Sequence, residues 1–132
     1  MNPTEEIEII DSETIEKACI LGFLKYLEDK DSIMVDGKNK DIARIDIEKY
    51  KNFTKQLFTI EIDLAKLLPR LFNNERVKIP FNAKYELFEK IGSDFSAIVV
   101  DTSFSFGYLS KREDNSLNFE IDGDVSFKAN HI

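Results

Sequence analysis

The sequence predicts a single α+β domain in which three to four helices pack on a mainly antiparallel sheet with a C-terminal three-stranded meander. Three observations favour this fold class. The chain has 132 residues, which is the length of one domain. Apolar residues recur with helical spacing over much of its first part. From residue 95 onward apolar and polar residues alternate, as in strands with one buried face. No repeat or linker divides residues 1–132.

The clearest helix prediction covers Ser12–Lys30. Its apolar residues recur at i, i+3, i+4 and i+7, and at positions 18–24 they occupy nearly every side of the helix. Asp11 or Ser12 is suited to accept a hydrogen bond from the first free backbone N–H groups. We expect this helix to lie in the core, with Cys19 as a small buried side chain. A single cysteine excludes an internal disulfide.

The segments on either side of this helix are shorter. Residues Glu5–Ile10 place isoleucines between acids, which predicts a short edge strand or an extended arm whose charges discourage edge-to-edge pairing. Residues Asp31–Asp41 contain Asp36-Gly37 within a polar cluster, the chemistry of a turn, and predict a loop with a small β-excursion.

The middle of the chain predicts two helices and a strand. Helical spacing favours a helix from about Asp46 to Lys55 or Leu57. The segment Leu57–Leu64 then has a period of two, which predicts a half-buried strand. Asp63 is placed to cap a helix over Leu64–Phe72, and Pro69 lies past its first turn, where it should kink or shorten that helix.

A fourth helix is predicted over Asn82–Ile91, after a short extended piece at Val77–Pro80. Asn82 serves as its cap, and Gly92 follows its last residue, where glycine commonly ends a helix. The side chains expected to face the core from this helix are those of Tyr85, Leu87, Phe88 and Ile91.

The C-terminal meander is predicted from three alternating segments. They are Phe95–Leu109, Leu117–Ile121 and Val125–Phe127, and Asp122-Gly123 is the two-residue hairpin signal that joins the last two. Within the first segment the aromatic side chains alternate with Ser and Gly. We expect them to face the core rather than to form a base-stacking platform, because no basic residue flanks them in sequence; they are Phe104, Phe106 and Tyr108.

No motif for catalysis, cofactor or metal binding is present. The single histidine, His131, is next to the last residue, and the serines lack the G-x-S-x-G frame. Asp29-Lys30-Asp31 and Asp122-Gly123-Asp124 resemble parts of cation loops but lack the glycine and closing glutamate of an EF-hand. We therefore expect a protein that is not an enzyme and carries no cofactor or metal. A hydrolase built on two acids that meet only in the fold stays open.

The net charge of −7 comes from the two ends of the chain, where acids outnumber bases in residues 1–30 and 91–132. Such a balance disfavours nucleic acid and suits a basic protein partner, although acids also simply solvate a surface. We expect a small binding protein that occludes or scaffolds such a partner, as immunity proteins and inhibitors do. The candidate contacts are Glu5, Glu6, Glu8, Asp11, Glu113, Asp114, Asp122 and Asp124.

The alternative function is a nucleic-acid-associated accessory module that uses the basic segment 38–55. Its cations would neutralise phosphate and its aromatic residues Tyr50 and Phe53 would stack on bases. Interleaved acids favour an ordinary solvated helix face instead. The cations are Lys38, Lys40, Arg44, Lys49, Lys51 and Lys55.

The middle of the chain resembles part of a known protein family, and the first residues indicate a location. The stretch Lys40–Phe72, with IARIDIEKYKNF followed by TIEIDLAKLL, resembles the N-terminal helical region of replicative minichromosome-maintenance helicases; it covers about a quarter of the chain and does not extend into the C-terminal strands. The first residues, MNPTEEIEIIDSE, are acidic where a secretory signal has a basic region. We expect a cytoplasmic protein that does not bind membranes.

Overall fold

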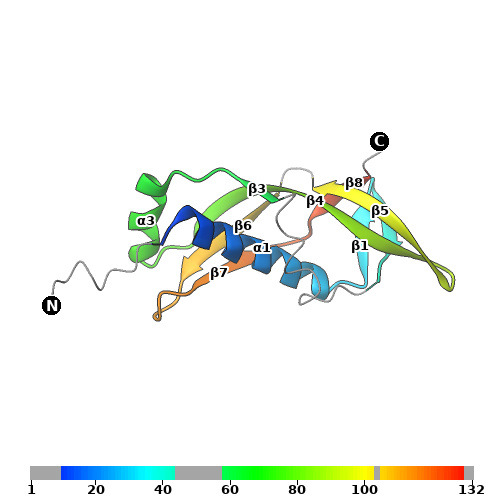
Figure 1. The fold of residues 1–132 in the computed structure, drawn as a ribbon, viewed down its shortest axis with the longest axis horizontal. Helices are drawn as coiled ribbons and strands as arrows, with labels where there is room; N and C mark the ends of the chain where they lie inside the picture. Colours follow the sequence, from blue (N-terminus) through cyan, green and yellow to red (C-terminus); the bar gives the residue numbers. More distant parts are fainter. Residues whose placement is uncertain (1–9, 44–57, 103–104, 130–132) are drawn as a thin grey trace.

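The computed structural model describes residues 10–43, 58–102 and 105–129. These residues form an elongated molecule in which two helices lie against one eight-stranded sheet (Figure 1). The elements in chain order are α1 (Ser12–Glu28), β1 (Ser32–Val35), β2 (Lys38–Asp41), β3 (Phe58–Ile60), α3 (Leu64–Phe72), β4 (Val77–Ile91), β5 (Asp94–Thr102), β6 (Ser105–Lys111), β7 (Leu117–Ile121) and β8 (Ser126–Ala129).

The prediction of three to four helices is wrong for the described residues, because the expected helix at Asn82–Ile91 is the second part of a strand, β4. Side chains from Val77 to Leu87 alternate between buried and exposed, which is the period of a strand. Gly92 does not stop a helix. Its φ of +64° belongs to the two-residue turn that joins β4 to β5. The helix expected at 46–57 lies outside the described residues.

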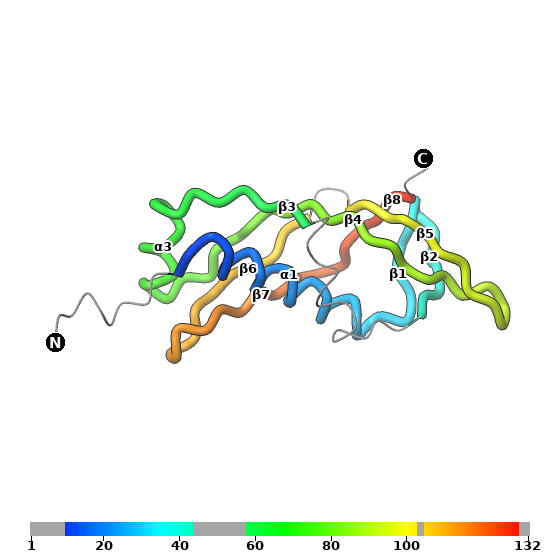
Figure 2. Tube along the Cα trace, in the orientation of Figure 1, coloured from blue at the N-terminus to red at the C-terminus, as the bar shows by residue number. Residues whose placement is uncertain are grey.

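Strand β4 is the spine of the sheet. Its residues Val77–Phe81 pair with β6, and its residues Lys84–Ile91 pair with β5. The short strand β3 also pairs with β4 near Phe81. Because β6 pairs with β4 at the same residue, β3 lies on the edge of β4 opposite to β6. Figure 2 shows β4 running along the molecule, from the end near α3 to the hairpin at the other end.

The C-terminal meander is only partly correct. Strands β6 and β7 form the predicted antiparallel hairpin, but the segment expected as one strand from Phe95 to Leu109 is two strands, β5 and β6, on different parts of β4. Strand β8 does not pair with β7 at all. It pairs antiparallel with β5 and parallel with β1, so Asp122-Gly123 lies in a crossover connection rather than in a hairpin.

The two faces of β6 are the reverse of those predicted. Ser105, Gly107 and Leu109 face the core, whereas Phe106 and Tyr108 are half-buried on the other side. Gly107 explains the reversal, because a β-carbon there would overlap the ring of Phe119. The core side of β6 must be small at this point, so the large rings take the opposite face. Phe104 lies outside the described residues.

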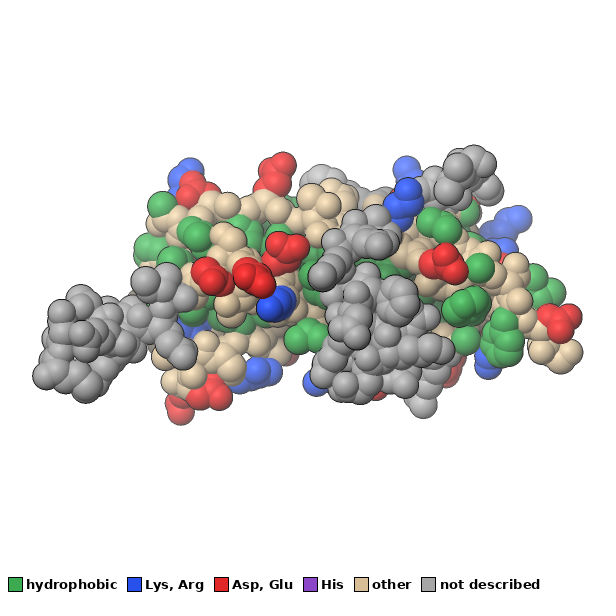
Figure 3. All heavy atoms as spheres, viewed as in Figure 1, with side chains coloured by type: hydrophobic (Ala, Val, Ile, Leu, Met, Phe, Trp, Pro, Cys, Tyr) green, Lys and Arg blue, Asp and Glu red, His purple; other side chains and the backbone are tan. Residues whose placement is uncertain are grey.

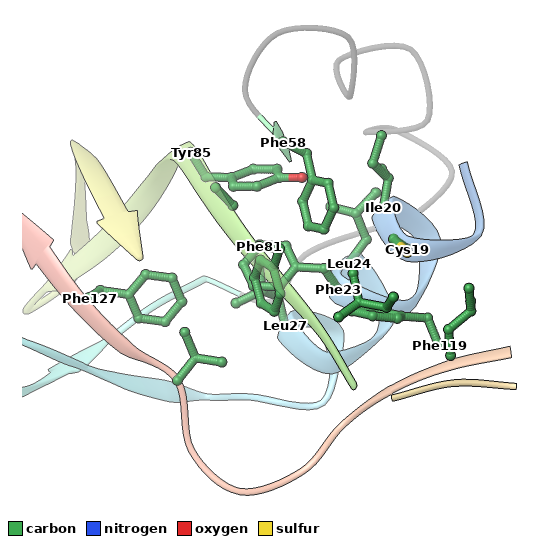
Figure 4. Close-up of a cluster of buried hydrophobic side chains, with 14 of the residues drawn as sticks. Cys19, Ile20, Phe23, Leu24, Leu27, Phe58, Phe81, Tyr85, Phe119 and Phe127 are labelled. Carbon is green, nitrogen blue, oxygen red and sulfur yellow. The ribbon is translucent and has the colours of Figure 1, made fainter. Parts of the chain in front are cut away.

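The predicted first helix is confirmed as a buried helix, but it ends at Glu28 rather than Lys30, and Leu21, within its apolar stretch 18–24, is 42% exposed. Asp11 caps α1, because its carboxylate accepts hydrogen bonds from the backbone N–H of Thr14 at 2.8 Å and from its hydroxyl at 2.7 Å. Phe23 lies at the centre of the core, with its ring centroid 5.3 Å from that of Phe81 and 5.1 Å from that of Tyr85 (Figure 4). Rings at such separations pack favourably.

Two smaller predictions are also confirmed. Asp36 and Gly37 have φ of +51° and +77° and join β1 to β2 in a two-residue turn, the geometry of a type I′ hairpin. Helix α3 begins after Asp63, whose carboxylate accepts a hydrogen bond from the N–H of Ala65 at 3.1 Å. It continues through Pro69 to Phe72, so Pro69 does not shorten it. The predicted strand at 57–64 is shorter than expected, since β3 ends at Ile60.

Candidate functional site

The most exposed apolar part of the described chain is the outer end of the β4–β5 hairpin, residues 88–97, which we name the arm. Leu87 is the last buried residue of β4 and Val100 is the first of β5, with 2% and 0% of their surfaces exposed. Between them lie four cross-strand pairs and the turn Gly92-Ser93. The arm therefore extends beyond the hydrophobic core (Figures 1 and 2).

The turn at the tip is chemically specified. Gly92 has a positive φ and Ser93 does not, the signature of a type II′ turn, which places glycine at the first central position. This turn has the twist that two antiparallel strands need, so the arm is a regular hairpin. Its pairs are Phe88 with Ala97, Glu89 with Ser96, Lys90 with Phe95, and Ile91 with Asp94.

Large apolar side chains gather on the arm. The described residues expose six of them, and three of the six lie here: Phe88, Ile91 and Phe95 have 41%, 57% and 58% of their surfaces exposed. In Figure 3 hydrophobic side chains are visible on this end of the molecule. Contiguous exposed apolar surface on a small protein commonly marks a contact site.

Two of these residues share one face of the arm. Cross-strand partners point to the same side of a sheet, and side chains alternate along each strand. Phe88 and its partner Ala97 therefore lie on the same side as Lys90 and its partner Phe95. The two phenylalanines are diagonal neighbours, within reach of each other. We call this side, formed by Phe88, Lys90, Phe95 and Ala97, the aromatic face; Ile91 points to the opposite side.

The base of the arm is held firmly. The backbone N–H of Ala43 donates to the carbonyl oxygen of Phe88 at 2.8 Å, and Ile42 forms a β-bridge with Glu89. Lys40 forms an ion pair with the Glu89 carboxylate at 3.1 Å, with about a third of the lysine side chain exposed. These contacts fix the direction in which the aromatic face is presented.

The predicted acidic contacts are not on the arm. Asp11 is used as the cap of α1, and hydrogen bonds from the Thr14 hydroxyl and N–H lower the pKa of its carboxyl. Asp114 lies in the β6–β7 turn beside Glu113, and hydrogen bonds from the Ser116 hydroxyl and N–H likewise lower its pKa. Glu5, Glu6 and Glu8 lie outside the described residues.

The other two predicted acids are at the far end of β7. Asp122 and Asp124 follow this strand, and Asp124 is 3.4 Å from the ammonium group of Lys30. The β6–β7 turn precedes the strand, so its five residues, about 15 Å long, separate the two acidic pairs. The structure thus does not bring Glu113 and Asp114 together with Asp122 and Asp124.

The predicted basic segment is described only in part. Lys38 is exposed on β2 and Lys40 is paired with Glu89, whereas Arg44, Lys49, Lys51 and Lys55 lie outside the described residues. A different basic group is visible in the structure. Arg76 lies over the ring of Tyr108, 4.7 Å from its centroid, and Lys78 lies 3.8 Å from the centroid of Phe106.

The described residues hold two buried groups of potential chemical interest. Burial raises the pKa of the Cys19 thiol to about 12, with a smaller contribution from Glu16. Burial also raises the pKa of Tyr85, whose hydroxyl has no hydrogen-bond partner in the described part of the chain. Both lie in the core rather than on an accessible surface (Figure 4). Residues 10–43, 58–102 and 105–129 contain no group of three acids, histidines or cysteines arranged to hold a metal ion.

Sequence reasoning missed the arm because it assigned Phe88 and Ile91 to the buried face of a helix. The signal that identifies it is the period of two from Val77 to Leu87, which Pro80 obscured. Neither of the described helices is long and apolar enough to cross a lipid bilayer. Comparisons of the chain with protein-family models, with curated proteins and with solved structures found no match.

Proposed function

We propose that this is a non-catalytic, cytoplasmic binding protein that holds a protein partner against the aromatic face of its arm, and so occludes or scaffolds that partner. The observation that carries the proposal is the position of Phe88 and Phe95, which are exposed diagonal neighbours on one face of a hairpin outside the core. Aromatic anchors of this kind dominate the energetics of protein interfaces.

A protein partner fits this face better than nucleic acid does. The face combines two phenylalanines and an alanine with a single cation, Lys90, and the whole chain carries a net charge of −7. Nucleic-acid binding depends on the neutralisation of several phosphates, which this arm does not provide. The predicted acidic contacts would then act at the rim of the interface or on a separate basic region of the partner, where charge steers association.

The experiment compares capture of partners from an extract of the native host by tagged variants. The variant Phe88→Ser with Phe95→Ser removes the aromatic face, and Phe72→Ser is the matched control, since Phe72 is 42% exposed on α3, away from the arm. We expect the wild type and Phe72→Ser to capture a protein that the arm variant does not capture. The thermal unfolding midpoints of all three proteins show whether each variant is folded. Equal retention by the arm variant would contradict the proposal.

A second candidate function rests on the cations over Tyr108 and Phe106. Lys78 comes from β4, Arg76 lies immediately before that strand, and the rings come from β6, so the fold supplies the flanking bases that the sequence around the aromatics lacks. Such a face is suited to single-stranded nucleic acid. Salt-dependent binding of an oligonucleotide, lost in Arg76→Glu with Lys78→Glu and unaffected by Phe88→Ser, would favour this function over the first.

A further inference from the structure

Besides its aromatic face, the arm has a strand edge that no described residue pairs with. One edge of β5 pairs with β4 over its whole length from Asp94 to Asp101. On the other edge β8 pairs only with residues Val100 to Thr102. Within the described residues, positions 94–99 of β5 therefore have no strand on this side.

The direction of the backbone groups follows from one hydrogen bond. The carbonyl oxygen of Phe88 accepts from Ala43, so it points away from β5. Its antiparallel partner is Ala97, and in such a pair the backbone groups of both residues point outward. The N–H and C=O groups of Ala97 therefore point to the free edge. Those of Phe95 and Val99 point the same way, because the direction alternates along a strand.

This edge lacks the features that protect edges against pairing. Residues 94–99, DFSAIV, contain no proline and no lysine, and their one charge is Asp94 at the tip. Strand β2, at another edge of the same sheet, is by contrast charged at three of its four residues, KNKD. An unprotected edge next to exposed aromatic side chains is a template for another strand.

We propose that the strand that occupies this edge is β5 of a second copy of the chain, which gives a two-fold dimer with a continuous β4–β5–β5–β4 sheet. In β5 only the odd-numbered residues direct their N–H and C=O groups to this edge. An odd-numbered residue of one copy must therefore lie opposite an odd-numbered residue of the other. With the axis at Ser96, Phe95 of each copy lies opposite Ala97 of the other, a large side chain beside a small one. Moving the axis to Ala97 would place Asp94 opposite Val100, whose edge β8 already occupies.

The second copy is favoured over an unrelated strand because the edge is complementary to itself. In this register Asp94 lies opposite Ile98, so no like charges face each other. Two-fold pairing also covers this edge of β5 in both copies at once, so the pairing closes at two chains. Because the axis is perpendicular to the sheet, the Phe88 and Phe95 side chains of both copies lie on one side. The dimer deepens the proposed function by doubling the aromatic face. It is held by the backbone groups of the edge and by the contact of Phe95 with Ala97, whereas Phe88, on β4, takes no part in the pairing.

The test is the mass of the purified protein by light scattering and analytical ultracentrifugation over a range of concentrations. We expect twice the 15.3 kDa of one chain for the wild type. Ala97→Pro removes an N–H group that faces the edge and takes none from the pairing with β4, so it should raise the dimer dissociation constant by roughly tenfold or more. Phe88→Ser should leave the dimer intact, because Phe88 belongs to the face.

Hydrogen exchange provides the second measurement and does not depend on a variant. The amides of Phe95, Ala97 and Val99 should be protected at high concentration and should exchange faster on dilution. A wild-type mass of one chain at every concentration, or a dimer as strong in Ala97→Pro, would overturn the inference. If the wild type is a monomer, and the amides of Phe95, Ala97 and Val99 become protected only when a partner that Phe88→Ser fails to retain is added, the partner occupies the edge. The second copy is then wrong while the proposed function stands.

Discussion

Gly22 of α1 lies directly against the backbone carbonyl of Phe119 in β7, so closely that a β-carbon at position 22 would overlap the oxygen. The ring of Phe119 extends across the sheet to Gly107 of β6, which is also too close for a β-carbon. One phenylalanine is thus enclosed by two glycines from distant parts of the chain. This arrangement sets the distance between the helix and the sheet.

Gly22→Ala should destabilise the protein although alanine is the better helix former. In a solvent-facing helix position the exchange is favourable by up to about 1 kcal/mol. Here the added methyl group must displace β7, and overpacking of this kind costs about 1–3 kcal/mol. Urea unfolding followed by circular dichroism measures the net effect. Glu16→Ala, an exposed position of the same helix, is the control and should change the free energy of unfolding little. A more stable Gly22→Ala protein would contradict the packing.

Thr102→Val should also lower stability, and for a different reason. The hydroxyl oxygen of Thr102, which is 7% exposed, accepts a hydrogen bond from the backbone N–H of Ala83 at 2.9 Å. Valine has the same shape but leaves this buried N–H unpaired, which costs about 1–3 kcal/mol. Thr102→Ser keeps the hydroxyl, so it should retain more of the stability than valine does. Equal stability of Thr102→Val and the wild type in chemical denaturation would show that the bond is unimportant.

Asp11→Asn should change how stability depends on pH. The hydrogen bonds from Thr14 lower the pKa of Asp11 in the folded protein below its ordinary value of 3.8. The ionised carboxylate therefore stabilises the fold at pH above about 3.8, and this stabilisation is lost as the pH falls through the folded pKa. Asparagine also caps a helix but does not titrate. At pH 7 the wild type should have the higher thermal unfolding midpoint. The difference between the two midpoints should become smaller as the pH falls from 4 to 2. A constant difference would argue against this role.

Cys19 should be unreactive toward thiol reagents until the protein unfolds. Its side chain is fully buried in α1, and burial holds its pKa near 12, so almost no thiolate forms at pH 8. The rate of modification by a disulfide reagent, measured across a urea series, should rise together with unfolding. Rapid modification of the folded protein would show that the centre of α1 is accessible.

The sequence predicts those elements whose signals are local. The cap at Asp11 and the turn at Asp36-Gly37 depend on residues that are neighbours in the chain, and both are confirmed. The pairing of strands is not local. Asp122-Gly123 has the chemistry of a hairpin turn, yet β8 pairs with β1 and β5 and does not return to β7.

The arm was missed because two patterns overlap in its sequence. Tyr85, Leu87, Phe88 and Ile91 also fit one face of a helix, and Gly92 fits either a helix end or a hairpin turn. The period of two from Val77 to Leu87 favours a strand, and the long pairing of β4 with β5 and β6 decides for it, because that pairing satisfies the backbone along fifteen residues. Such tertiary pairing overrides local propensity.

Site-specific photo-crosslinking in cells of the native host tests directly whether the aromatic face is the contact surface. A photoreactive amino acid replaces Lys90, an exposed residue of the aromatic face, in one variant and Glu113 in the β6–β7 turn in another. We expect a crosslink to a partner protein from position 90, retained in an otherwise wild-type arm and lost when Phe88 and Phe95 are also changed to serine. Crosslinks from position 113 with none from position 90 would show that the acidic turn, and not the arm, is the contact surface.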